Sequence, residues 1–333
     1  MGPTAAGKTD LAIALAQAFN GELISVDSAL VYRDLNIGAA KPEFPHHLID
    51  IRDPSEPYSA MQFARDAKAA IADIRARGRL PILVGGTMLY FRALLEGLDD
   101  MPASDPGVRQ KIEAEAARKG WPALHEQLQR VDPVLAARLH PNHSQRIARG
   151  LEIWQMTGKP LSHWQSGHGD GGIGETPISL VVCPKERSVL HARIASRLEK
   201  MLREGLLDEV RQLWQRGDLS PELPAIRAVG YRQLWAFLEG ESSKTEASQA
   251  VLFATRQLAK RQLTWLRRWS ADAWLLTGER GELLDVTHVS APIWRQFAVN
   301  SRLEMGDFTP LADNKSMMAA LQVAINATYS GAL

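Results

Sequence analysis

The chain has 333 residues, of which 45% are hydrophobic, and its formal net charge is +1 at pH 7. This length can bury a large core and corresponds to roughly two domains of about 150 residues each. The single cysteine, Cys183, excludes an intramolecular disulfide, and no stretch approaches the ~18 consecutive apolar residues of a membrane span. We therefore expect a cytoplasmic protein without membrane contact, in which any nucleic-acid binding depends on local clusters of basic residues.

A phosphate-binding pattern stands at the start of the sequence. Residues 2–9 form a complete G-x-x-x-x-G-K-[ST] motif, the P-loop, and an apolar helical pattern follows it. Backbone N–H groups and Lys8 can bind a diphosphate, Thr9 can ligate Mg²⁺, and the helix points its positive end at the phosphates. A P-loop normally follows a buried strand, and none precedes this one. We therefore expect either that the native start lies upstream or that the fold lacks its central strand.

Short apolar runs alternate with helical patterns along much of the chain. The strand candidates are residues 22–26, 47–51, 80–84, 178–182 and 273–277, and the last of these would close the sheet. The longer helix candidates are residues 59–77, 188–203 and 247–269. This alternation predicts an α/β fold, namely a doubly wound parallel sheet that contains the P-loop.

The middle of the chain has a different character. Residues 98–162 are polar, helical in pattern, without strand candidates, and interrupted by prolines. We predict that they form an inserted all-helical subdomain, while residues 1–97 and 163–310 form the α/β core. The glycine-rich residues 166–174 are predicted to be a flexible return loop, and residues 311–333 a tail of unknown role.

Two polar residues follow predicted strands. Asp27 comes directly after strand 22–26, and Thr87 follows Gly85 and Gly86 at the end of strand 80–84. Ligands bind at the carboxyl ends of the strands in α/β sheets, which favours a functional role for Asp27. The alternatives are that Asp27 caps a turn or lies in a solvated loop, and that Thr87 caps the next helix.

The strand ends also bear on the reaction class. A kinase or nucleotide hydrolase needs an acidic residue after an apolar strand to hold Mg²⁺, and strand 80–84 ends in Gly-Gly-Thr instead. Phosphoryl transfer is therefore disfavoured, and an ATP-dependent small-molecule kinase is kept as the alternative. A non-catalytic RNA-binding protein is a third hypothesis.

Basic residues gather in three segments. Residues 256–269 hold five basic residues and two tryptophans, residues 226–232 form a second basic and aromatic turn, and Arg146 and Arg149 lie three apart on a predicted helix. Each segment alone is typical of a solvated helix face. Together they favour RNA binding.

The order of these motifs resembles the tRNA dimethylallyltransferases, also called the IPP transferase family, which transfer a five-carbon prenyl group to N6 of the adenosine beside the anticodon. The matching segments extend from residue 1 to about residue 270. They are residues 2–9, 24–33, 40–42, 46–50, 84–90, 140–146, 157–162, 230–233 and 254–265. The commoner family pattern has a glycine where this chain has Met88.

The resemblance implies a role for each motif. The prenyl donor would be dimethylallyl diphosphate and the cofactor Mg²⁺, which Thr9 would meet directly or through the diphosphate. Asp27 would be the general base for N6, and Thr87 would contact the substrate near the reacting centre. The diphosphate would be held by Thr4, Ala5, Ala6, Gly7, Lys8, Thr9 and Arg197.

The resemblance further implies a tRNA partner, bound by a monomer whose helical insertion grips the anticodon stem-loop. The product would be N6-(dimethylallyl)adenosine at position 37 of tRNAs that read codons beginning with U. The implied tRNA contacts are Asp27, Ser28, Ala29, Leu30, Thr87, Arg109, Gln145, Arg146, Ile147, Ala148, Arg149, Arg227, Ala228, Val229, Gly230, Tyr231, Arg232, Lys260, Arg261, Gln262, Leu263, Thr264, Trp265, Leu266 and Arg267.

Overall fold

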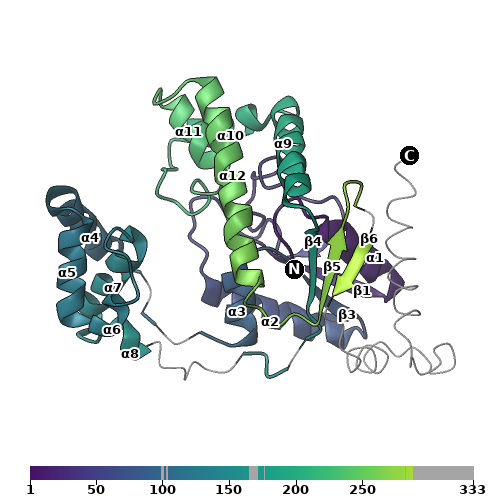
Figure 1. The fold of residues 1–333 in the computed structure, drawn as a ribbon, viewed down its shortest axis with the longest axis horizontal. Coiled ribbons are helices and arrows are strands. Elements are labelled where there is room, and N and C mark those ends of the chain that lie inside the picture. The colour runs from purple at the N-terminus through teal and green to yellow at the C-terminus, as the bar shows by residue number, and fades with distance from the viewer. Residues whose placement is uncertain (99–100, 103, 165–171, 176, 282, 288–333) are drawn as a thin grey trace. The chain divides into compact units, whose positions relative to one another are not determined.

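The computed structural model describes residues 1–98, 101–102, 104–164, 172–175, 177–281 and 283–287 (Figure 1). Most of the predicted return loop and all of the predicted tail lie outside these residues. The chain divides into two compact units. The core unit contains Met1–Leu94 and the chain from Thr176 onward, and the helical unit is Leu95–Glu175.

The first sheet of the core unit is parallel throughout. Its strands are β1 (Gly21–Val26), β2 (His46–His47) and β3 (Leu80–Gly85), in the order β2-β1-β3. Leu23 and Ile24 of β1 are buried, as the apolar run predicts. The helices of this half are α1 (Lys8–Ala18), α2 (Ala60–Ala76) and α3 (Met88–Leu95).

Strand β2 is shorter than the predicted strand over residues 47–51. It ends at His47, because Leu48 and Asp50 adopt left-handed backbone conformations, with φ of 65° and 58°. Such conformations interrupt the extended backbone that a ladder requires. A single bridge between Tyr32 and Arg52 continues the parallel direction beyond this break.

The second sheet of the core unit is mixed. Strand β4 (Leu180–Pro184) pairs in parallel with β5 (Ala273–Thr277), and β6 (Leu283–Thr287) adds to β5 in the antiparallel direction. The prediction that β5 closes the sheet is therefore wrong, because the hairpin to β6 covers its other edge. Met1 lies beside β4. Its terminal amino group donates to the Leu180 carbonyl at 2.7 Å, and its carbonyl accepts from the Val182 amide at 2.9 Å.

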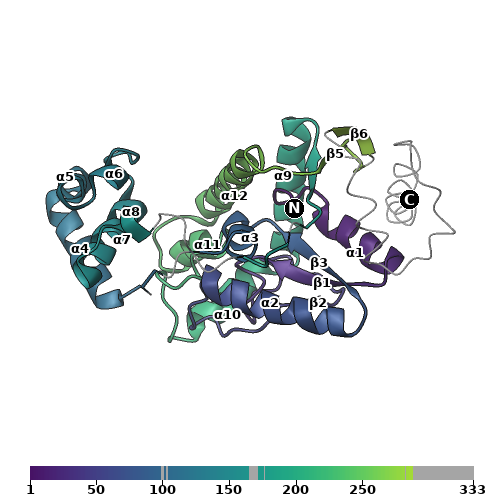
Figure 2. The same cartoon turned by 90° about the horizontal axis from the view of Figure 1, so that it is seen from below.

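The single sheet that the sequence predicts is thus divided, in the described residues, into two three-stranded sheets. Helices α9 to α12 complete the described part of the core unit (Figures 1 and 2). They are α9 (Arg187–Arg203), α10 (Leu206–Gln215), α11 (Tyr231–Leu238) and α12 (Lys244–Leu266). Helices α9 and α12 pack together through a cluster of Leu190, Ile194 and Ala259 that also contacts Ala5 of the P-loop. This packing places α12 beside the phosphate-binding motif.

The helical unit consists of five helices in its described residues. They are α4 (Pro106–Lys119), α5 (Trp121–Val131), α6 (Pro133–Ala136), α7 (Ser144–Thr157) and α8 (Leu161–Trp164). Three of the prolines that predict breaks, Pro106, Pro122 and Pro133, stand in the first turns of α4, α5 and α6, where the missing N–H is not needed. Apolar residues of α4, α5 and α7 form one buried core that includes Ile112, Leu128 and Ile147.

Candidate active site

The P-loop turns sharply into helix α1. Ala5 and Gly7 have positive φ values of 61° and 86°, and the Ala6 amide donates to the Pro3 carbonyl at 3.3 Å. Among the described residues, no side chain caps the N-terminus of α1. The first amides of the helix are therefore left without a capping side chain, which is the arrangement that suits an anion.

Two cations lie near this helix end. The Lys8 Nζ lies 3.4 Å from the Pro3 carbonyl, and Arg197 comes from helix α9. Burial lowers the pKa of Lys8 to about 8, with Asp27 opposing and Arg197 adding to the shift. Burial also lowers the pKa of Arg197, and Asp27 and Asp10 oppose that shift. Lys8, Arg197 and Asp27 are thus close enough to act on one another electrostatically.

Arg197 has no hydrogen bond and no ion pair with any described residue. A partly buried guanidinium with no hydrogen-bonded acceptor is unfavourable, and an anionic ligand would supply such an acceptor. The contact of Arg197 with a diphosphate stays a prediction.

Asp27 follows β1 and folds back on its own turn. Its Oδ1 accepts from the amides of Ala29 at 2.8 Å and Leu30 at 3.4 Å. Its Oδ2 has no hydrogen-bond partner among the described residues. One carboxylate oxygen therefore fixes the turn, as the capping alternative requires, and the second remains available to a substrate.

Thr87 lies beside this turn because β1 and β3 pair in register, with Val26 opposite Gly85. The Thr87 Oγ1 accepts from the Ser28 amide at 3.1 Å, and the Thr87 amide donates to the Val26 carbonyl at 3.2 Å. The side chain thus binds the Asp27 turn instead of capping α3. A Cβ on Gly85 would lie 2.0 Å from the Val26 carbonyl oxygen, so only glycine permits this approach.

Gln262 of α12 connects the P-loop to the end of β3. Its Oε1 accepts from the Thr4 amide at 2.9 Å, and its Nε2 donates to the Gly86 carbonyl at 3.0 Å. The side chain is 8% exposed. Gln262 therefore holds the P-loop against the end of β3. Because its side chain is buried in these bonds, it is not exposed for the predicted contact with tRNA.

Comparisons with known proteins identify the family of this chain. Residues 30–269 match the family model described as IPP transferase. The chain belongs to this family. It is 58% identical over 284 residues to the tRNA dimethylallyltransferase of Halorhodospira halophila, covering 82% of this chain and 92% of that protein. It is 53% identical over 294 residues to tRNA dimethylallyltransferase 2 of Hahella chejuensis, and the match covers 83% of this chain and 89% of that protein.

Solved structures of IPP transferases also resemble this chain. The tRNA isopentenylpyrophosphate transferase of Bacillus halodurans is 34% identical, with a TM-score of 0.60, covering 98% of this chain and 96% of that one. A eukaryotic dimethylallyltransferase, described as acting on tRNA, is 26% identical with a TM-score of 0.67. The match covers 96% of this chain and 82% of that one. The α/β fold with a parallel sheet is therefore shared across these IPP transferases.

The predicted tRNA contacts of this IPP transferase fall into exposed and buried groups. In the core unit, the side chains with exposed positions are Ser28, Arg227, Arg232, Lys260, Arg261, Thr264, Trp265 and Arg267. Tyr231 and Leu266 are fully buried, and Gly230 is also buried. The partly exposed positions are Asp27, Ala29, Leu30, Thr87, Ala228, Val229 and Leu263. Because buried side chains cannot reach RNA in this conformation, Tyr231 and Leu266 leave the predicted contact set.

Tyr231 instead belongs to a support that the sequence does not reveal. Its hydroxyl donates to the Glu209 carboxylate at 2.6 Å, and burial raises the pKa of Tyr231. Glu209, on α10, also accepts from the amides of Asn36, Ile37 and Gly38 at 2.7–3.0 Å. This buried carboxylate holds the loop that follows the Asp27 turn. An acidic residue on an amphipathic helix gives no sequence signal of such a role.

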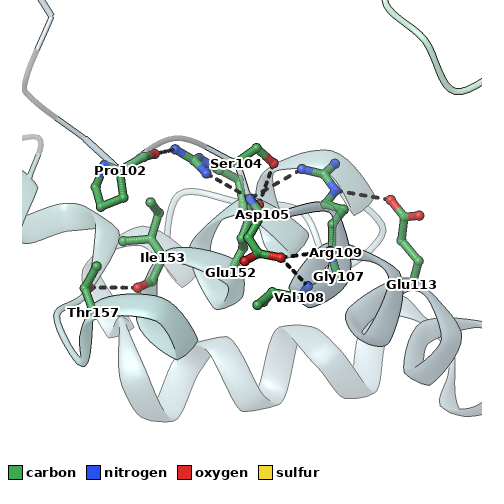
Figure 3. Close-up of polar contacts among 11 residues, drawn as sticks. Pro102, Ser104, Asp105, Gly107, Val108, Arg109, Glu113, Glu152, Ile153 and Thr157 are labelled. Carbon is green, nitrogen blue, oxygen red and sulfur yellow. Dashed lines mark hydrogen bonds and ion pairs between the residues drawn. The ribbon is translucent and has the colours of Figure 1, made fainter. Parts of the chain in front are cut away.

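In the helical unit, Gln145 and Arg146 are exposed on α7, whereas Ile147 and Ala148 are buried in its core. Ile147 and Ala148 therefore also leave the predicted contact set. Arg109 and Arg149 are about one quarter exposed and both approach Glu152. Figure 3 shows Arg109 beside Glu152. Arg149 thus points partly inward, which the shared helix face with Arg146 does not predict.

The described residues contain no cluster of three or more His, Cys, Asp or Glu side chains able to hold a metal ion. Thr9, the predicted Mg²⁺ contact, lies in the first turn of α1 and is partly exposed. In the same part of the chain, none of the helices has the length and apolar character needed to cross a bilayer.

Proposed function

We propose that this chain transfers a dimethylallyl group from dimethylallyl diphosphate to N6 of adenosine 37 in tRNAs that read codons beginning with U, releasing diphosphate. The observation that carries the proposal is the free Oδ2 of Asp27, placed near the two cations of the P-loop site. The relatives named above support tRNA prenylation, and they do not favour the kinase alternative. We further propose that the core unit is a doubly wound P-loop domain of a cytoplasmic monomer.

The diphosphate half of the reaction would take place at the end of α1. The loop from Thr4 to Thr9, with Lys8 and Arg197, would bind the diphosphate oxygens, where negative charge increases as the C–O bond breaks. The amides of Thr4 and Ala6 already donate to Gln262 and Pro3, so the other amides of the loop would make the backbone contacts. The Thr9 hydroxyl, in the same turn as these amides, is an oxygen ligand of the kind that Mg²⁺ combines with substrate phosphates and water. Mg²⁺ held there would neutralise charge on the departing diphosphate.

The adenine half would depend on Asp27 and Thr87. The N6 lone pair forms the new N–C bond to the prenyl carbon while the electron pair of the C–O bond leaves with the diphosphate. Asp27 Oδ2 would orient the amine and accept its proton, and Thr87 would contact the substrate beside the reacting atoms. The target base must leave its stack to reach this site.

The exposed basic residues provide the RNA-facing part of the proposal. Lys260, Arg261 and Arg267 would bind the tRNA backbone, and Trp265, which is 37% exposed, offers an aromatic face for stacking. The helical unit, through Arg146 and its neighbours, would grip the anticodon stem-loop as an inserted subdomain.

The decisive experiment incubates the protein with dimethylallyl diphosphate, Mg²⁺ and an unmodified tRNA that carries consecutive adenosines after the anticodon. We expect the tRNA to gain the mass of one prenyl group, located by nuclease mapping at adenosine 37. A parallel reaction replaces dimethylallyl diphosphate with ATP and small acceptors and should release no ADP. Folded protein that binds tRNA but yields no prenyl adduct would overturn the proposal.

A further inference from the structure

Glu152 of α7 places a carboxylate inside the core of the helical unit. Its side chain is completely buried, and it lies next to the apolar residues Leu151 and Ile153. A buried carboxylate is strongly unfavourable unless hydrogen bonds and opposite charges compensate for the missing water. The hydrogen-bond and ion-pair partners of Glu152 therefore indicate which segments it positions.

One oxygen of Glu152 binds the segment that leads into α4. Its Oε1 accepts from the Ser104 hydroxyl at 2.5 Å and from the Asp105 amide at 2.9 Å (Figure 3). Asp105 is the N-cap of α4, with Oδ1 accepting from the amides of Gly107 and Val108. Glu152 thus fixes the start of α4 against α7.

The other oxygen of Glu152 binds two arginines from different helices. Its Oε2 lies 2.9 Å from Nη1 of Arg149, one turn away on α7, and 3.7 Å from Nη1 of Arg109 on α4. Arg149 also donates through Nη2 to the Pro102 carbonyl at 2.5 Å, and Arg109 donates through Nε to Glu113 at 3.1 Å. Each guanidinium therefore has a fixed orientation.

Both arginines keep part of their surface in solvent. Arg109 is 25% exposed and Arg149 27%. A guanidinium has five N–H donors in a rigid fork, so the contacts described leave donors on each that can bind phosphate oxygens. Arg146, which is exposed on the preceding turn of α7, adds a third cation.

We propose that Glu152 is a positioning residue for tRNA binding, which holds the guanidiniums of Arg109 and Arg149 in one geometry for the RNA backbone. The inference rests on the proposed function, because RNA is the anion that these arginines would meet. Glu152 touches neither substrate nor reacting atoms. Its effect should therefore fall on tRNA affinity and leave the chemical step unchanged.

The variant Glu152→Gln separates positioning from simple charge. It removes a negative charge beside two arginines, so tRNA binding would tighten if the arginines acted only as charges. If Glu152 positions them, binding weakens. We expect the Kd for tRNA to rise about tenfold, while kcat at saturating tRNA and the KM for dimethylallyl diphosphate stay within twofold. Tighter or unchanged tRNA binding would overturn the proposal.

Glu115→Gln is the matched control, because it removes the same charge from α4, where Glu115 pairs with Lys119. It should change tRNA affinity by less than twofold. A double-mutant cycle adds a second readout: Arg109→Gln should weaken binding less in the Glu152→Gln protein than in the wild type. An equal effect in both backgrounds would contradict positioning.

Circular dichroism and thermal unfolding establish that Glu152→Gln is folded. If it is not, Glu152→Asp replaces it, because aspartate keeps the charge and shortens the side chain by one methylene. Weaker tRNA binding at unchanged charge then supports positioning, and unchanged binding overturns it. Wild-type protein that neither binds nor prenylates tRNA would instead refute the proposed function.

Discussion

Gln262 accepts a hydrogen bond from the backbone amide of Thr4 at 2.9 Å, although the two residues are 258 positions apart. A second bond, from Gln262 Nε2 to the Gly86 carbonyl, makes the same side chain a bridge to the end of β3. A Cβ on Gly86 would lie 2.3 Å from that nitrogen. The P-loop, the Thr87 turn and helix α12 are therefore held by one amide group.

Replacing Gln262 with leucine should weaken this junction without changing its volume much. The Thr4 amide would lose its partner, and an unsatisfied amide in this enclosed position costs about 1–3 kcal/mol. We expect a lower melting temperature and roughly tenfold weaker binding of dimethylallyl diphosphate, measured by calorimetry. Gln257→Ala, at an exposed position of the same helix, is the control and should match the wild type. If Gln262→Leu bound dimethylallyl diphosphate as tightly as the wild type, Gln262 would not be needed to hold the P-loop.

Asp27→Asn should separate catalysis from binding. The asparagine Oδ1 can still accept from the Ala29 amide, so the turn is kept, but the amide group cannot take a proton from N6. We expect the single-turnover rate to fall by roughly 100-fold or more, with tRNA affinity within a few fold of the wild type. Loss of tRNA binding with an unchanged rate for the bound complex would remove Asp27 from the role of general base.

The pKa of Lys8 predicts two opposite pH effects. In the free protein burial lowers this pKa from 10.5 to about 8. Between these values the unfolded chain binds more protons than the folded one, so stability rises with pH across that interval as the cost of burying the ammonium disappears. A bound diphosphate favours the charged form instead, so its affinity should fall by up to about tenfold per pH unit above pH 8.

Calorimetry with inorganic diphosphate tests this effect of pH on binding. At about pH 9, titrations in two buffers with different ionisation enthalpies should reveal proton uptake on binding. Lys8→Met should bind more weakly and show less proton uptake at the same pH. The same uptake in both proteins would show that another group titrates.

Tyr231→Phe and Arg232→Gln should affect different properties, although the two residues are neighbours. Tyr231→Phe keeps the ring but removes the bond to Glu209, which should cost about 1–3 kcal/mol of unfolding free energy in urea. Arg232 is exposed, so Arg232→Gln should weaken tRNA binding with little change in stability. The reverse pattern would place Tyr231, and not Arg232, at the RNA surface.

The double variant Lys260→Gln, Arg261→Gln should reduce the salt dependence of tRNA binding. Both side chains are exposed on α12. Removing one cation that binds a phosphate should reduce the magnitude of the slope of log K for tRNA binding against log salt by about one. Filter binding at several salt concentrations measures the slope. Lys200→Gln, an exposed position on α9 that pairs with Glu204, is the control. An unchanged slope in the double variant would show that Lys260 and Arg261 do not bind phosphates.

The sequence by itself predicts the parts of this protein that depend on local spacing. The motif from Gly2 to Thr9 and the alternation of apolar runs indicate a phosphate-binding α/β protein. Asp27 and Thr87 become candidates because Asp27 directly follows β1 and Thr87 follows β3 after Gly86, and the parallel register of Val26 with Gly85 then brings their turns together. Strand β6 is missed, because its sequence shows no clear periodic pattern, and β2 is predicted too long, because the left-handed backbone at Leu48 and Asp50 has no sequence signal.

The tertiary structure decides which polar side chains point inward. Gln262, Glu209 and Glu152 all lie on helices whose sequences suggest solvated polar faces, yet each is buried and bonded to distant backbone amides. Sequence periodicity locates the apolar face of a helix but does not reveal which remote segment will bring a hydrogen-bond partner to a polar position. Because a polar group can be buried only where such a partner arrives, the supports of the site become visible only in the folded chain.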